Sequence, residues 1–131
     1  MSLIINLIGE KLERKKMNSK KTGTAYEIIA ADYLKTRGVH IIEMNYRTSR
    51  GEIDIIGKEK DTLIFIEVKY RKNASYGNPW EAISVEKQRK ICYVAKQYLL
   101  KNSWKWQVRF DVISICGDEI IWFPNAFYDN F

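Results

Sequence analysis

The stretch GEIDIIGKEKDTLIFIEVKYR, residues 51–71, decides the fold. It contains two β-rich runs, at 51–57 and 62–70, that flank a short polar segment at 58–61. Apolar, β-branched runs bounded by turn residues are typical of strands, and so short a link allows antiparallel pairing. The stretch therefore predicts two adjacent antiparallel strands.

The pattern on either side extends this pair into an α/β domain. A helical spacing of apolar residues at 22–37 precedes a β-rich segment at 39–46, and a long amphipathic helix is predicted at 84–101. Strands at 107–116 and 119–123 follow. The order α-β-β-β-α-β-β predicts one central mixed sheet flanked by helices.

Length and composition favour one soluble domain. The 131 residues are 46% apolar and 29% charged, which suits a compact core. Residues 1–21 carry a net charge of +4 out of +6 and are interpreted as a basic arm or helix, while 22–131 form the domain. The apolar runs are too short to cross a bilayer, which predicts a protein without a membrane span. The two cysteines are well separated and suggest no disulfide framework, which predicts a cytoplasmic protein.

Three charged residues interrupt the predicted strands. Glu67 and Lys69 share one face because side chains alternate along a strand, and Asp54 on the neighbouring strand can approach Glu67. Two carboxylates withdrawn from water require a counter-ion, and their hard oxygen ligands suit Mg²⁺ or Mn²⁺. The alternative is an ordinary Glu67–Lys69 pair at the solvent edge, with Asp54 facing water.

A longer set of residues resembles a known family. Gly51-Glu-Ile-Asp54, twelve residues and then Glu67-Val-Lys69 resemble the signature of PD-(D/E)XK nucleases. The chain after Met17 resembles the YraN-like family of predicted endonucleases in four further segments, namely Gly23–Glu27, Asn45–Asp54, Phe65–Arg71 and Glu81-Ala-Ile with Lys87-Gln88. The resemblance implies a restriction-endonuclease-like fold with an α-β-β-β-α-β core.

The resemblance also implies roles for individual residues. Asp54 and Glu67 match the metal-binding acids, and Lys69 matches the lysine that orients or polarises the attacking water. Glu27 matches an acid of Holliday-junction-resolvase-like relatives, although Thr24-x-x-Glu27 is also a helix capping box. Gln88 matches a helix position that borders such sites, and a solvated glutamine is the alternative.

The predicted function is therefore metal-dependent hydrolysis of DNA phosphodiester bonds, on branched or single-stranded structures. The alternative is a non-catalytic module that keeps the fold and binds nucleic acid or protein. A homodimer or protein partner could use the basic arm or the aromatic segment 122–131.

Overall fold

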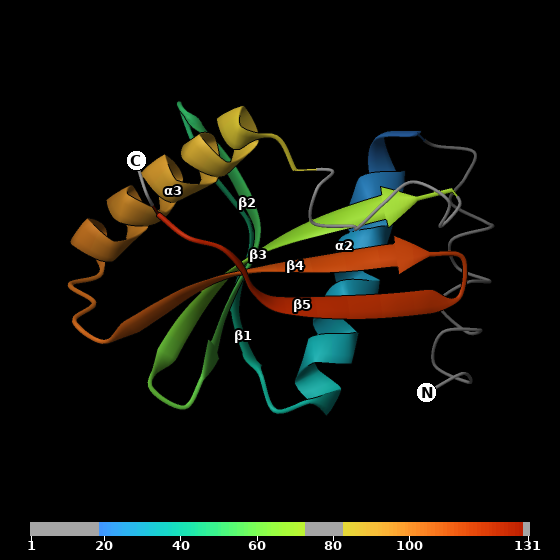
Figure 1. Cartoon of the computed structure of the whole chain (residues 1–131), viewed down its shortest axis with the longest axis horizontal. Helices are drawn as coiled ribbons and strands as arrows, with labels where there is room; N and C mark the ends of the chain where they lie inside the picture. Colours follow the sequence, from blue (N-terminus) through green and yellow to red (C-terminus); the bar gives the residue numbers. More distant parts are fainter. Residues whose placement is uncertain (1–18, 73–82, 130–131) are drawn as a thin grey trace.

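The computed structural model describes residues 19–72 and 83–129, which form two helices and five strands (Figure 1). The elements are, in chain order, α2 (Ser19–Thr36), β1 (His40–Thr48), β2 (Gly51–Glu59), β3 (Thr62–Arg71), α3 (Val85–Lys101), β4 (Gln107–Cys116) and β5 (Glu119–Phe127). The predicted order of elements is confirmed. The predicted arm and the loop before α3 lie outside the described residues, except that the α2 helix already begins at Ser19.

The strands form one mixed sheet in the order β1-β2-β3-β4-β5. All neighbours pair antiparallel except β3 and β4, which are parallel. Parallel neighbours need a crossover connection, and α3 lies on it. Ser84 caps the start of α3, since its hydroxyl accepts a hydrogen bond from the Lys87 N–H at 3.1 Å.

The two helices cover opposite faces of the sheet, so the core has two halves. Buried residues of α3, such as Val94, pack with Phe65 and Phe110. Buried residues of α2, such as Leu34, pack with Ile64 and Ile113. The result is a three-layer α/β/α arrangement (Figure 1).

The β1–β2 pair changes faces in the middle of the sheet. Ile53 belongs to the α3 side of the core and Ile55 to the α2 side, although residues two apart normally share a face. Opposite this point on β1, Asn45 has a left-handed φ of 54°. The main-chain pairing of β2 with β3 also ends here, at Ile55–Ile66. Beyond it β2 turns toward α3 while β3 continues beside β4, which makes a fork between the two strands (Figure 1).

Three aromatic side chains of the C-terminal segment, at 122, 123 and 127, are wholly or partly covered by the domain itself, while Phe131 lies outside the described residues. The last strand, β5, ends at Phe127 and not at residue 123 as predicted, so it continues past Pro124. It lies at the edge of the sheet, where a strand tolerates proline. Phe127 is buried, and Trp122 and Phe123 pack against the two core clusters. These three side chains therefore give no reason to expect a partner, whereas Tyr128 is 61% exposed.

Candidate functional site

Asp54 lies at the fork between β2 and β3 and is only 6% exposed. Its Oδ2 accepts a hydrogen bond from the main-chain N–H of Val68 at 2.8 Å. The carboxylate thus accepts a main-chain hydrogen bond from β3 at the point where β2 no longer pairs with this strand. This hydrogen bond fixes the position of the Asp54 side chain. The alternative in which Asp54 faces water is wrong.

Two further carboxyl groups meet Asp54 at the fork. Glu67 follows the buried run of β3 and its side chain is 11% exposed, while Glu27 projects from α2 and is 9% exposed. The negative charge of Asp54 raises the pKa of both groups, so both carboxyl groups lie within interaction distance of Asp54.

The pKa values reflect this crowding. Burial, followed by the charge of Asp54, raises the pKa of Glu67 from 4.5 to about 8. The same two causes raise the pKa of Glu27 to about 7. Burial also raises the pKa of Asp54, against the opposing effect of the Val68 N–H. The three groups together therefore carry fewer negative charges at neutral pH than three separate acids.

Two lysines provide positive charge beside the acids. Lys69 follows Glu67 on the same strand and lowers the pKa of Glu67 through its charge. Lys87, in the first turn of α3, places its Nζ 3.8 Å from Oε1 of Glu67. The sequence did not predict that Lys87 lies beside the acids. Its direct approach to Glu67 depends on how α3 docks, which no spacing in the sequence reveals.

Glu27 owes its position to α2 rather than to a helix cap. The capping-box interpretation is wrong, because α2 begins at Ser19 and Thr24 lies inside the helix. Glu27 instead lies beside Asn45, whose polar side chain lowers the pKa of Glu27 against the larger effects of burial and of Asp54. Sequence reasoning missed this role of Asn45. Its only signal was a turn-favouring residue inside a β-rich segment.

Gln88 and Glu52 take structural roles at the margin of the site. The Gln88 side chain donates a hydrogen bond from Nε2 to the carbonyl of Ile83 at 3.1 Å, which secures the chain before α3. Glu52 pairs with Arg47 at 3.0 Å, and its charge still raises the pKa of Asp54. Neither observation assigns these two residues to catalysis.

The donor atoms fit a cation that retains water ligands. One oxygen of Glu27 and one of Glu67, both named Oε2, are buried without a hydrogen-bond partner. Such orphaned oxygens are costly unless a cation or proton is bound nearby. Within residues 19–72 and 83–129, no group of three or more acidic, His or Cys side chains is arranged to hold a metal. A Mg²⁺ ion usually needs only one or two carboxylates, so Asp54 and Glu67 suffice.

Basic side chains surround the fork, and several contact other groups. Arg50 lies over the ring of Tyr93 at 5.5 Å, and Lys90 pairs with Glu86 at 3.5 Å. Two tyrosines of the sheet are engaged within the domain, since Tyr70 stacks on Tyr26 of α2 and Tyr46 packs against the core. Tyr76 and Trp80 lie outside the described residues.

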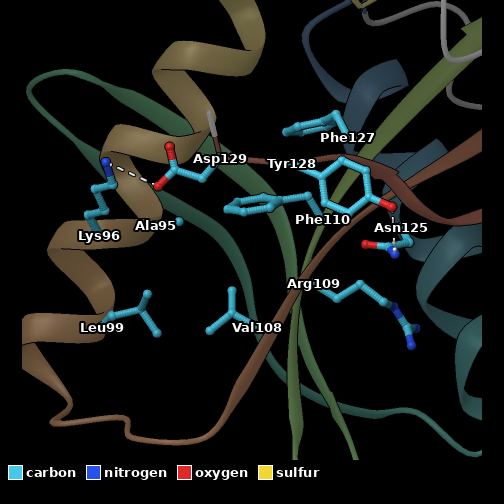
Figure 2. A pocket seen from close by; sticks show the side chains of 10 residues that line it. All are labelled: Ala95, Lys96, Leu99, Val108, Arg109, Phe110, Asn125, Phe127, Tyr128 and Asp129. Carbon is cyan, nitrogen blue, oxygen red and sulfur yellow. Dashed lines mark hydrogen bonds and ion pairs between the residues drawn. The ribbon is translucent and has the colours of Figure 1, made fainter. Parts of the chain in front are cut away.

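A separate cavity of about 230 Å³ lies between α3 and the β4–β5 pair (Figure 2). Its walls include Leu99, Val108 and Phe110, and Lys96 pairs with Asp129 at one end, 3.1 Å apart. It contains no residue of the carboxylate cluster. In the described part of the chain, no helix is long and apolar enough to cross a membrane.

Comparison with known proteins places the chain among relatives without an assigned function. Residues 26–115 match the sequence profile of the Uncharacterised protein family UPF0102. A UPF0102 protein of Lachnoclostridium phytofermentans is 46% identical over 113 residues, which are 85% of this chain and 96% of the relative. UPF0102 proteins of Dictyoglomus turgidum and Chromohalobacter salexigens are 41% and 37% identical, over 85% and 84% of this chain and 100% and 93% of the relatives.

Proposed function

The chain belongs to the Uncharacterised protein family UPF0102, and from that premise we propose that it is a metal-dependent endonuclease that hydrolyses DNA phosphodiester bonds. The observation that carries the proposal is the cluster at the fork, where Asp54 meets Glu27 and Glu67 beside Lys69 and Lys87. Burying acids that repel each other costs free energy. A cation bound between the acids offsets that cost, which supports a metal site at the fork.

Each residue of the cluster has a role in this proposal. Asp54 and Glu67 would hold Mg²⁺ or Mn²⁺, and the Val68 N–H would keep Asp54 oriented. The cation, when bound, would supply Lewis-acid polarisation and lower the pKa of a water ligand. Lys69 would stabilise the charge that develops on the phosphate. Glu27, whose pKa lies near neutrality, would hold or release a proton at the edge of the site.

The order of elements agrees with the nuclease interpretation. The resemblance of Asp54 and Glu67-Val-Lys69 to the PD-(D/E)XK signature implies acids on two adjacent core strands, and β2 and β3 are adjacent and antiparallel. The restriction-endonuclease-like core implied by that resemblance has the order α-β-β-β-α-β, which matches α2 to β4. Exposed basic residues around the fork would bind the phosphates on either side of the cleaved bond.

The competing hypothesis is a binding module that keeps the fold without cleaving DNA. The two hypotheses differ in what depends on Asp54. An enzyme loses cleavage when Asp54 is changed to Asn, while a binding module retains all of its measurable activity.

The deciding experiment incubates the purified full chain with Mg²⁺ or Mn²⁺ and labelled linear, flapped and four-way DNA. We expect cleavage of at least one branched or flapped substrate, loss of that cleavage in Asp54→Asn, and full activity in the matched control Asp118→Asn. Asp118 is exposed in the β4–β5 turn, so its change preserves the fork. A wild-type protein that binds all these DNAs and cuts none of them would favour the binding module.

A further inference from the structure

An exposed tryptophan marks a second surface, at the end of the sheet away from the carboxylates. Trp106, in the link between α3 and β4, is 63% exposed. It lies edge-on to Trp104, with ring centroids 5.0 Å apart. Trp104 is held in turn, because it packs against the α3 side of the core and its Nε1 donates to the Gln107 carbonyl at 3.0 Å. The fixed ring of Trp104 therefore presents Trp106 to solvent.

Positive charge surrounds these two rings. The Nζ of Lys58, on β2, lies 5.6 Å from the centre of the Trp104 ring. Lys105 and Trp106 line an open hollow of about 580 Å³ together with Asp61 of the β2–β3 turn. The two segments that meet here also carry exposed Lys60 and Lys101.

The nearby acids do not cancel this charge. Glu59 is engaged by Arg109, at 3.8 Å, which leaves Asp61 as the opposing charge among the residues just named. We call Trp104, Trp106, Lys58 and Lys105 the tryptophan patch. It combines an accessible aromatic face with cations on a polar surface, and its hollow also has the polar Gln107 in its wall.

We infer that the tryptophan patch binds a single strand of nucleic acid, with a base stacked on Trp106 and phosphates on the lysines. Unpaired bases expose faces that stack on aromatic side chains, and a positively charged groove attracts the backbone. A protein partner would favour an anchor set in an apolar, charge-depleted centre, whereas Trp106 has lysines and an acid around it.

The patch and the carboxylates contact different parts of a bound nucleic acid. Thr62, at the patch end of β3, pairs with Gln107, and Glu67 lies five residues further along the same strand. At about 3.3 Å per residue these points are roughly 16 Å apart. The inference therefore stands on the patch alone, and only its contribution to substrate choice rests on the proposed nuclease function.

The test uses the full chain in EDTA and fluorescein-labelled 20-nucleotide dT and U strands, which separate DNA from RNA binding. Stacking of one base predicts that Trp106→Ala weakens binding of at least one strand by about tenfold or more. Trp106→Phe should keep most of the affinity. Tyr128→Ala, which removes an equally exposed aromatic ring elsewhere, should leave affinity unchanged. Lys105→Ala should reduce the salt slope of binding by about one.

The outcomes separate this inference from the nuclease proposal. Asp54→Asn should bind both strands at least as well as wild type. If the wild-type protein cuts no DNA and Trp106→Ala still loses strand binding, the patch stands and the nuclease proposal falls. Two outcomes would overturn the inference. In the first, Trp106→Ala and Tyr128→Ala both melt at the wild-type temperature and bind the strands equally well. In the second, the wild-type protein binds neither strand.

Discussion

Replacing Glu67 with Gln should stabilise the metal-free protein at alkaline pH while removing a proposed metal ligand. Glu67 is nearly buried, and burial followed by repulsion from Asp54 raises its pKa to about 8. A carboxyl group with a raised pKa contributes stability below its unfolded pKa, near 4.5. That contribution is lost as the pH rises through about 8, where the folded group ionises.

The size of the effect follows from the pKa change. At about 1.36 kcal/mol for each pH unit, ionising Glu67 in the folded protein costs on the order of 5 kcal/mol. Gln avoids this cost but gives up the attraction to Lys87. We expect a net gain of about 1–3 kcal/mol at pH 9, or roughly 5–10 °C in melting temperature, and almost none at pH 4.

The assay is urea and thermal unfolding in EDTA at pH 4, 7 and 9, for wild type, Glu67→Gln and the control Glu119→Gln. Glu119 is exposed on β5, so its neutralisation should change stability by less than about 0.5 kcal/mol at each pH. A Glu67→Gln protein that is less stable than wild type at pH 9, or equally stabilised at pH 4 and 9, would refute the description of Glu67 as a buried, strained acid.

Four other changes test different parts of the structure. Millimolar Mn²⁺ should raise the melting temperature of wild type, because the cation relieves repulsion between buried acids, and should leave Asp54→Asn unaffected. Lys69→Ala should abolish cleavage yet weaken DNA binding only modestly, as gel shifts would show; equal losses of both would contradict its catalytic role. Asp111→Ala should cost about 3–5 kcal/mol in urea unfolding, because this fully buried acid binds an arginine through two hydrogen bonds. Gly57→Ala should cost about 1–3 kcal/mol, because its new Cβ would lie 2.8 Å from Val39, and an unchanged midpoint would show that this contact relaxes.

The order of helices and strands was predictable because it follows from local patterns, namely the alternation of side chains along a strand and the helical spacing of apolar residues. The strand 107–116 coincides with β4, and the polar segment 58–61 includes the observed turn. The end of β5 was not predictable, because Pro124 is a strand breaker everywhere except at a sheet edge, and edge position is a tertiary property.

The candidate site was predictable only in part. The short turn pairs β2 with β3 up to Ile55–Ile66, and Asp54 and Glu67 follow directly, close enough for the charge of Asp54 to raise the pKa of Glu67. The involvement of Asn45 and Lys87 was not predictable, since it depends on the change of faces in the β1–β2 pair and on the docking of α3. Residue spacing within one strand carries no information about either.

The hairpin register has a consequence for how this site can vary in length. Paired positions on β2 and β3 sum to the same number, from Glu59–Thr62 to Ile55–Ile66, and Asp54 and Glu67 are the next residue on each strand, just beyond the last pair. Adding or removing one residue on each strand therefore keeps both acids next to the last pair, whereas a single insertion moves one acid to the other face unless a bulge absorbs it. The length of the twelve-residue spacer between the acids can therefore change only by an even number of residues. Even changes preserve the acid pair, and odd changes disrupt it.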